Sequence, residues 1–254
     1  MKLTAIAWIA AIINQQSAVG AAVSLGAQQK PPYFILTGDS TVAVNGGWGD
    51  GFLSFLKAPA EGINPAKSGA TTVSFRRQGL WDKALQAVRD NAANAQPIVT
   101  MQFGHNDQKP AANISTEQFR NNLEVMSREA REAGAFPIII TSLTRRTFEN
   151  GQVVQNLKEH SELAIQAAKA AGAMVLDLNM ASTNYVNAIG EANAQYYNLA
   201  EGDRTHLNPK GEVVFGRLVI DLLLDQRKDL GCYFRPNPVL SEKLRKGEFA
   251  TGDE

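Results

Sequence analysis

The chain has a single cysteine, Cys232, among its 254 residues, so no disulfide can form within it. Its fold therefore depends on burying apolar side chains, and a hydrophobic content of 44% supports an extensive core in one domain of this length. Cys232 lies late in the chain, far from the motifs described below and without a histidine near it. We interpret it as a structural thiol and not as a catalytic nucleophile.

Net charge is also absent, because 25 lysines and arginines balance 25 aspartates and glutamates. No overall field recruits nucleic acid or an anionic membrane, so any charged partner must be recognised locally. Histidines are scarce too, and the three are His105, His160 and His206. So few imidazoles argue against a metal cluster, and we expect no metal and no other cofactor. We place His160 on a solvent-facing helix surface.

Long apolar runs are missing as well. The run over residues 3–13 is well short of the roughly 20 residues that span a bilayer, and no later segment is long and apolar enough. With Lys2 before it and small residues after it up to Ala22, this run is typical of a secretory signal peptide over residues 1–22. We therefore expect a secreted, extracellular protein that is free of the membrane after signal removal.

Four apolar runs suit buried parallel strands, and a weaker fifth lies near Ile63. The four cover residues 33–37, 97–103, 136–141 and 173–178. Helical patterns lie between them, and strands that alternate with helices pair in parallel through right-handed crossovers. The sequence thus predicts an α/β fold, a three-layer α/β/α sandwich around a parallel sheet of about five strands in flavodoxin-like order.

The clearest helical pattern covers about 116–133, where Phe119, Leu123, Met126 and Ala130 share one face. Further helices are predicted over about 154–171, around Trp81 to Val88, around Phe52 to Leu56, and after Asn208, with Pro209 at the first helical position. We assign residues 30–228 to one domain and residues 229–254 to a polar C-terminal extension that wraps the surface or frays. We expect a monomer.

The most informative motif is Gly38-Asp39-Ser40, which directly follows the first predicted strand and places a hydroxyl at its carboxyl end. Open α/β sheets carry their ligand sites at this edge. Three further blocks follow later elements in the same way, namely Gly69, Gly104-His105-Asn106-Asp107 and Asp203-Arg204-Thr205-His206. Polar loop residues without a function would be shared between both edges, so this gathering predicts a site.

The residue types in these blocks suit acyl transfer. A serine hydroxyl is a weak nucleophile, so Ser40 needs a base, for which His206 is the candidate, and a group that orients the base, for which Asp203 is the candidate. Gly69 and Asn106, together with the Ser40 amide, are candidate donors to the negative oxygen that forms during attack. Taken singly, each residue is also typical of an ordinary turn or cap. Their combination favours catalysis.

These four blocks resemble the SGNH or GDSL hydrolase superfamily over nearly the whole chain that follows the expected signal peptide. The resemblance implies Ser40 as nucleophile, His206 as base and Asp203 as the residue that orients it. It further implies an oxyanion hole formed by Ser40, Gly69 and Asn106, and it implies no metal.

Longer blocks resemble the rhamnogalacturonan acetylesterase branch of that superfamily. They are Gly38-Asp39-Ser40-Thr41 with Gly47-Trp48-Gly49, Ser74-Phe75-Arg76-Arg77-Gln78-Gly79, Gly104-His105-Asn106-Asp107 and Thr144-Arg145-Arg146-Thr147-Phe148. The resemblance implies a serine carbohydrate esterase that removes acetyl groups from a pectic polysaccharide containing galacturonate, through an acyl-enzyme intermediate. An acetylated polysaccharide is then the expected partner.

Arginine forks bind carboxylates, and galacturonate supplies one carboxylate per sugar. Of Arg76, Arg77, Arg145 and Arg146 we expect Arg77 or Arg146 to contact substrate, and surface ion pairs explain the same four residues equally well. Trp48 fits both a stacking face for a sugar ring and a packed interior position.

Other functions remain open at this point. The fold also suits an esterase or thioesterase for lipid-like acyl groups, although no long apolar insertion suggests a lid, and it suits a non-catalytic carbohydrate-binding protein. The block around His105 superficially resembles metallophosphoesterase loops, but the chain has too few ligands. The glycine run over residues 46–51 lacks the spacing of a dinucleotide-binding loop.

Overall fold

The computed structural model describes residues 30–254, so the expected signal peptide over residues 1–22 lies outside the described part. Five parallel strands form the main sheet in the order β2-β1-β3-β4-β7. They are β1 (Pro32–Gly38), β2 (Glu61–Ile63), β3 (Gln96–Gln102), β4 (Phe136–Ile140) and β7 (Met174–Leu176). The second strand along the chain pairs outside the first, and the later strands follow on the other side. This confirms the predicted flavodoxin-like order.

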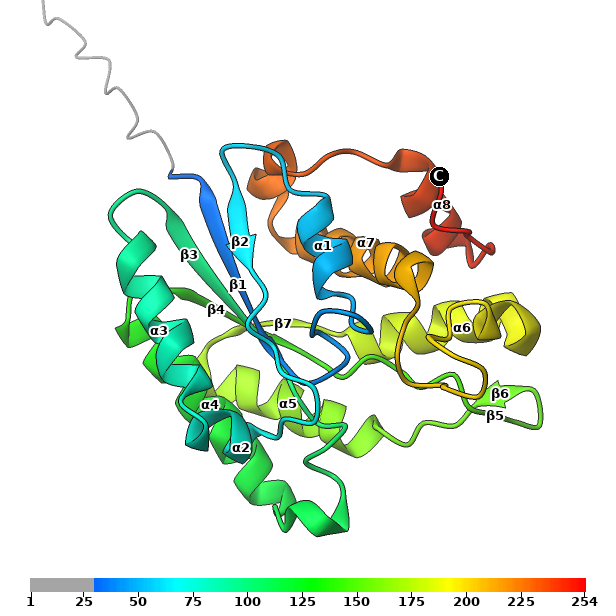
Figure 1. Ribbon diagram of the computed structural model, residues 1–254, viewed down its shortest axis with the longest axis horizontal. Helices are drawn as coiled ribbons and strands as arrows, with labels where there is room; N and C mark the ends of the chain where they lie inside the picture. The colour runs from blue at the N-terminus through cyan, green and yellow to red at the C-terminus, as the bar shows by residue number, and fades with distance from the viewer. Residues whose placement is uncertain (1–29) are drawn as a thin grey trace, which may run out of the picture.

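Helices cover both faces of the sheet (Figure 1). One face carries α1 (Gly49–Ser54), α6 (Leu178–Gln195), α7 (Pro209–Gln226) and α8 (Pro238–Lys246), which share one hydrophobic core. The other face carries α2 (Thr72–Arg77), α3 (Leu80–Asn91), α4 (Thr116–Glu132) and α5 (Lys158–Ala171), which share a second core. The strands divide their side chains between the two cores: Ile138 and Ile140 of β4 point into the first and Ile139 into the second.

Helix α4 shows how local sequence fixes an element. The Ser115 side chain accepts the backbone N–H of Gln118 and begins the helix, and Gly134, with φ of +99°, follows its end. The predicted apolar face of this helix is buried in the second core. Helix α7 begins in the same way, because the Asn208 side chain accepts the N–H of Gly211 and Pro209 occupies the first turn.

Several segments differ from the prediction, and α2 and α8 are among the helices that were not predicted. Helix α5 begins at Lys158, because the residues before it form a hairpin of β5 (Phe148–Glu149) and β6 (Gln152–Val153). Asn150 and Gly151 turn that hairpin with φ of +50° and +77°, a turn signal that the sequence carries. Helix α6 was not predicted, because it is rich in Asn, Ser and Thr and weak in helix propensity.

The C-terminal extension is ordered against the domain. It contains a 3₁₀ helix, η2 (Lys228–Tyr233), and α8, whose Leu240 and Leu244 are buried in the first core. The buried carbonyl of Ala250 accepts the hydroxyl of Tyr197 at 2.6 Å. The extension therefore wraps the surface and does not fray.

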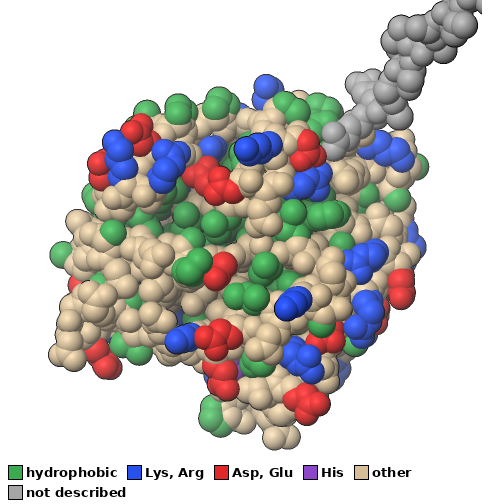
Figure 2. Space-filling model, turned by 180° about the vertical axis from the view of Figure 1, so that it is seen from behind, with side chains coloured by type: hydrophobic (Ala, Val, Ile, Leu, Met, Phe, Trp, Pro, Cys, Tyr) green, Lys and Arg blue, Asp and Glu red, His purple; other side chains and the backbone are tan. Residues whose placement is uncertain are grey.

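The surface carries charge of both signs. Figure 2 shows lysines and arginines interspersed with aspartates and glutamates over one face of the molecule. Of the helices described, none is both long and apolar enough to cross a bilayer. Cys232 is exposed on η2, which means that it is not a core thiol.

Candidate active site

The predicted site residues gather where the sheet strands end at their carboxyl edge. Ser40 follows β1, Asn106 follows β3, and Asp203 with His206 lie in the loop before α7. The chain order thus places three loops that are distant in sequence over one edge of the sheet.

Ser40, His206 and Asp203 form a continuous hydrogen-bonded relay. The Nε2 atom of His206 lies 2.9 Å from the Oγ of Ser40, and its Nδ1 lies 2.8 Å from the Oδ2 of Asp203. A carboxylate only accepts, so the bond to Asp203 assigns the imidazole proton to Nδ1 and leaves Nε2 free to accept the serine proton. The relay has the geometry that an activated serine nucleophile requires.

The Asp203 carboxylate is held in one tight turn. Its Oδ1 atom accepts the backbone N–H groups of Thr205 and His206, both at 3.0 Å. Partial burial raises the pKa of Asp203, but the hydrogen bonds from the backbone and ring of His206 and from Thr205 outweigh it and hold the pKa below its ordinary value. Asp203 therefore stays ionised and keeps the imidazole oriented.

Arg146 anchors the loop that carries Asp203 and His206. Its guanidinium is fully buried and donates to the carbonyl of His206 at 2.5 Å, to the carbonyl of Asp203 at 3.4 Å and to Asn198 at 2.8 Å. Burial lowers the pKa of Arg146 to about 10, with the nearby charge of Asp203 acting against this shift. The expectation that Arg146 contacts substrate is wrong, because its side chain is enclosed and holds the backbone of the relay.

Gly46 permits a close approach on the other side of the same loop. Its φ is +139°, and a Cβ there would lie 3.3 Å from the Cβ of His206. The carbonyl of Gly46 accepts the N–H of Leu207 at 2.8 Å. The glycine-rich segment thus contacts the relay with its backbone, which explains its composition without a dinucleotide.

The predicted oxyanion donors lie near one another. Asn106 is 8% exposed, and its side chain is fixed at both ends: Nδ2 donates to the carbonyl of Ala70 at 3.0 Å, and Oδ1 accepts the ammonium of Lys109 at 2.7 Å. One amide hydrogen of Nδ2 is left for a ligand. Gly69, next to Ala70, is exposed with φ of +77°.

Two backbone donors at this place are free. Among residues 30–254, the N–H groups of Ser40 and Gly69 donate to no acceptor. These two N–H groups and the Asn106 amide come from three separate loops, and their role in an oxyanion hole stays a prediction.

A buried polar layer lies beneath the relay. The Oδ1 atom of Asp39 accepts the N–H and hydroxyl of Thr41 at 2.9 and 2.8 Å, and Thr41 in turn accepts from Gln102. The indole N–H of Trp48 donates to Gln102 at 2.8 Å, and Trp48 is fully buried. Of the two positions considered for Trp48, the structure shows the packed one, so it offers no stacking face.

Two further ionisable groups of this layer, His105 and Asp107, were not singled out as site residues. The Nδ1 atom of His105 lies 3.6 Å from the Oδ2 of Asp39, and both side chains are enclosed. Asp107 accepts the N–H and hydroxyl of Thr72 at 2.8 and 2.6 Å. Burial raises the pKa of Asp107 to about 6, and the charge of Asp39 adds to the shift while Thr72 opposes it. Both residues lie in the block Gly104-His105-Asn106-Asp107, which was the sequence signal that could have identified them.

The remaining arginines of the predicted set lie in different settings. Arg76 is paired with Glu129, and Arg77 is exposed at the end of α2. Contact of Arg77 with substrate therefore stays a prediction. Arg145, which we did not expect to contact substrate, is half-buried. It donates to the hydroxyl of Thr205, in the loop that carries Asp203 and His206, which we call the relay loop.

No group of three or more potential metal ligands occurs within the described residues. His160 is 6% exposed and packs on Phe119, with ring centroids 4.9 Å apart, so our placement of it in solvent is wrong. Its helix α5 turns this face toward α4, where the two helices share the second core.

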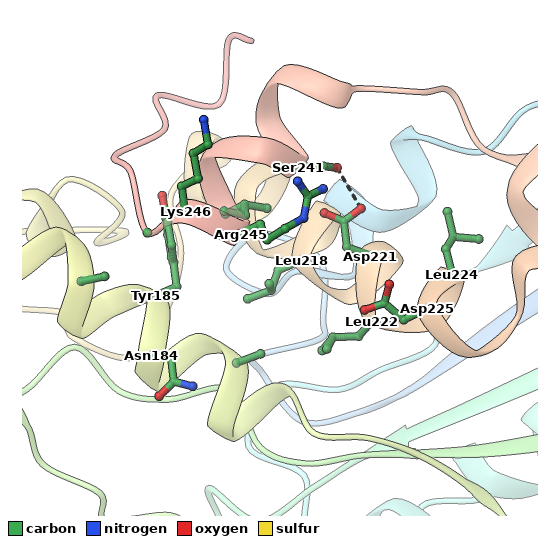
Figure 3. A pocket seen from close by; sticks show the side chains of 14 residues that line it. Asn184, Tyr185, Leu218, Asp221, Leu222, Leu224, Asp225, Ser241, Arg245 and Lys246 are labelled. Atoms are coloured by element: carbon green, nitrogen blue, oxygen red, sulfur yellow. Dashed lines mark hydrogen bonds between the residues drawn. The ribbon is translucent and has the colours of Figure 1, made fainter.

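A cavity of about 490 Å³ lies between α6, α7 and α8 (Figure 3). Four charged residues line it, namely Asp221, Asp225, Arg245 and Lys246. Of these, Asp221 is already paired with Arg217 and accepts the hydroxyl of Ser241, both at 2.9 Å. No residue of the relay lines this cavity, so it is separate from the candidate active site.

Comparison with known proteins identifies a family and two relatives with the same named activity. Residues 36–214 match the profile of the GDSL-like Lipase/Acylhydrolase family. The chain is similar to the rhamnogalacturonan acetylesterase RhgT of Bacillus subtilis, at 32% identity over 76% of this chain and 90% of the relative. It is also similar to the probable rhamnogalacturonan acetylesterase YesY of the same organism, at 30% identity over 74% and 90%.

Solved structures support the fold. The crystal structure of the YxiM protein of Bacillus subtilis matches with a TM-score of 0.69 and 22% identity, covering 80% of this chain and 58% of that one. An acetylxylan esterase from Geobacillus stearothermophilus matches with a TM-score of 0.56 and 13% identity, covering 80% and 95%. At these identities the likeness concerns the fold alone.

Proposed function

Since the chain belongs to the GDSL-like lipase and acylhydrolase family and is a serine carboxylic ester hydrolase, we propose that it removes acetyl groups from a pectic polysaccharide such as rhamnogalacturonan. The single observation that carries the chemistry is the relay from Ser40 through His206 to Asp203, with distances of 2.9 and 2.8 Å. The substrate is supported by the two relatives named as rhamnogalacturonan acetylesterases, at 32% and 30% identity.

The proposed reaction proceeds in two steps. In the first, the Oγ of Ser40 bonds to the acetyl carbonyl carbon while Nε2 of His206 takes the serine proton. His206 then gives this proton to the departing sugar oxygen as the ester bond breaks, which leaves an acetylated serine. In the second step water attacks the acetyl-serine, His206 takes one proton from the water and returns it to Ser40, and acetic acid leaves and ionises to acetate in solution.

The surrounding residues supply orientation and charge stabilisation in this proposal. Asp203 holds the imidazole and stabilises the imidazolium that forms transiently. The free N–H groups of Ser40 and Gly69 and the free hydrogen of Asn106 donate to the carbonyl oxygen as it becomes negative. Because the donors are fixed before the reaction, little reorganisation opposes the charge.

We further propose that the protein acts outside the cell as a monomer, with no nucleic-acid or membrane partner. The support is the signal-like composition of residues 1–22, which lie outside the described part, and the balanced surface charge. Detection of the processed chain in the culture medium tests export, and its elution at the mass of one chain tests the monomer.

The decisive experiment measures acetate released from acetylated rhamnogalacturonan, acetylated xylan and acetylated homogalacturonan at equal acetyl concentration. We expect rhamnogalacturonan to give the highest kcat/KM. A preference for xylan would overturn the pectic assignment. With 4-nitrophenyl esters of increasing chain length, activity should fall sharply from acetate to butyrate, whereas a lipid-type esterase would prefer the longer chains.

Ser40→Ala tests the nucleophile, with Ser54→Ala on the exposed end of α1 as the matched control. We expect Ser40→Ala to lower kcat on 4-nitrophenyl acetate by a factor on the order of 10⁴ to 10⁶. Equal rates in the wild type and in Ser40→Ala would remove Ser40 from the reaction.

A further inference from the structure

Arg145 differs from the other half-buried arginines in lacking an acidic partner. In residues 30–254, the half-buried guanidinium groups of Arg76, Arg120 and Arg227 each pair with a carboxylate. Arg145 pairs with none, and its one hydrogen-bond acceptor in the described chain is the hydroxyl of Thr205. A partly desolvated cation without a directly paired anion costs free energy, and an anionic ligand that paired with it would lower that cost.

The guanidinium of Arg145 lies close to the relay of Ser40, His206 and Asp203. Arg145 follows β4, and the next residue, Arg146, donates its backbone N–H to the carbonyl of Arg204 at 2.8 Å. The two loops therefore run together, and the Arg145 guanidinium reaches the residue just before His206. Burial lowers the pKa of Arg145, and the charges of Asp39 and Asp203 act against that shift, so the guanidinium lies near both the nucleophile loop and the relay loop.

The other arginines of the motif do not share this combination. Arg146 is enclosed and donates to the backbone of the relay loop and to the side chain of Asn198. Arg77 is exposed, and an exposed cation is solvated by water, so its lack of a partner indicates nothing. A guanidinium has five N–H donors in a planar fork, and at Arg145 most of them are uncommitted.

We propose that Arg145 binds the carboxylate of a uronic acid unit next to the scissile acetyl ester and thereby selects acetylated uronides over neutral acetylated sugars. This inference rests on the proposed function, whose polymer carries galacturonate. The fork of Arg145 matches the two oxygens of a carboxylate, and its anchoring by Thr205 reduces the side-chain freedom lost on binding. Arg145 thus sets specificity and is not part of the proton relay.

The test compares two substrates that differ only at C6, the methyl glycosides of mono-O-acetyl galacturonic acid and of the corresponding mono-O-acetyl galactose. The measured quantity is the ratio of their kcat/KM values. The wild type should prefer the uronide. Arg145→Gln should lower the ratio by about 10- to 100-fold, mainly through KM for the uronide. Arg145→Lys, which keeps the charge but not the fork, should give an intermediate ratio.

Two further variants test whether Arg145 acts by binding the substrate carboxylate or by stabilising the relay loop. Arg128→Gln removes one positive charge from the exposed surface of α4 and should leave the ratio at the wild-type value. Thr205→Val removes the anchor but keeps the cation, so it should lower the ratio less than Arg145→Gln does. Circular dichroism and thermal unfolding establish that each variant is folded.

The outcomes distinguish this inference from the proposed function. If Arg145→Gln keeps the wild-type ratio, or lowers kcat/KM for both substrates by the same factor, Arg145 does not recognise the carboxylate and the inference fails. If the wild type releases acetate from rhamnogalacturonan but shows no preference for the uronide, the inference fails while the proposed function stands. If the wild type releases no acetate from rhamnogalacturonan, the proposed function itself fails.

Discussion

Two aspartate–histidine pairs lie in the same region of the molecule and differ in almost every physical respect. Asp203 and His206 are three residues apart on one turn, their side chains are 27% and 33% exposed, and their closest atoms are 2.8 Å apart. Asp39 and His105 come from the ends of β1 and β3, are 0% and 3% exposed, and are 3.6 Å apart. The first pair faces solvent and the second is sealed beneath it.

The two pairs also differ in how completely their polar atoms are hydrogen-bonded. Asp203 accepts backbone and ring hydrogens with both oxygens, so the exposed pair is fully satisfied. In the buried pair, Oδ2 of Asp39 and both ring nitrogens of His105 have no hydrogen-bond partner. Asp39 precedes Ser40 and His105 precedes Asn106. The buried pair therefore lies where the residue before Ser40 meets the residue before Asn106, and the exposed pair is the one to which the proposed reaction assigns the proton transfer.

Among the substitutions in the two pairs, we expect Asp203→Asn to have the largest effect. The amide would favour the wrong imidazole tautomer, so kcat on 4-nitrophenyl acetate should fall by about 10⁴-fold with KM little changed. The free energy of unfolding should change by less than about 1 kcal/mol, because the pair is partly exposed. Asp90→Asn, on the exposed surface of α3, is the matched control. A loss of less than about tenfold would mean that His206 does not depend on Asp203.

Asn106→Ala addresses the loop that follows the buried pair. It removes one donor from the proposed oxyanion hole, so kcat should fall by about 10²- to 10³-fold, a smaller loss than for Asp203→Asn. Asn94→Ala, exposed after α3, should leave kcat at the wild-type value. A change confined to KM would show that Asn106 binds the ground state and not the transition state.

Asp39→Asn breaks the buried pair and should act mainly on stability. Burial raises the pKa of Asp39, but the electrostatic interaction with the nearby His105 and the hydrogen bonds from Thr41 outweigh it and hold the pKa below its ordinary value. Ionised Asp39 thus stabilises the fold above the pKa of an unfolded aspartate, and this contribution is lost as the pH falls. Urea unfolding at pH 7 should show a loss of about 3 kcal/mol. The deficit should shrink only below the unfolded aspartate pKa of about 3.9; one that is equal at pH 7 and at about pH 2.5 contradicts this linkage.

The smallest effect concerns Asp107, whose pKa is raised to about 6, mainly by burial. Its protonated form is favoured in the folded state, so its contribution to stability is highest below the unfolded pKa of about 3.9 and declines as the pH rises through 6. Asp107→Asn removes this dependence. Relative to the wild type, the variant should gain about 2 kcal/mol between pH 4 and pH 8 in urea unfolding. Parallel stability curves would show that Asp107 does not titrate in this range.

Much of the fold could be predicted because its signals are local. The apolar runs of β1, β3 and β4 and the face of α4 are continuous in sequence, and alternation of strands with helices leaves few topologies. Helix α6 escaped prediction because its Asn, Ser and Thr residues favour other conformations in isolation. Burial of Tyr185, Val186 and Ile189 in the first core stabilises it. The same holds for α8, whose apolar residues matter only once α7 lies beside them.

Within the site, the amino-acid sequence alone specifies which residue types follow the strands at their carboxyl ends, and hence Ser40, His206 and Asp203. The distinction between Arg145 and Arg146 required the folded structure, because neighbours with identical side chains differ solely in their surroundings. One is enclosed by the relay loop and the other keeps its charge free beside it. Burial and partner choice depend on contacts between segments distant in the chain, and no local pattern encodes them.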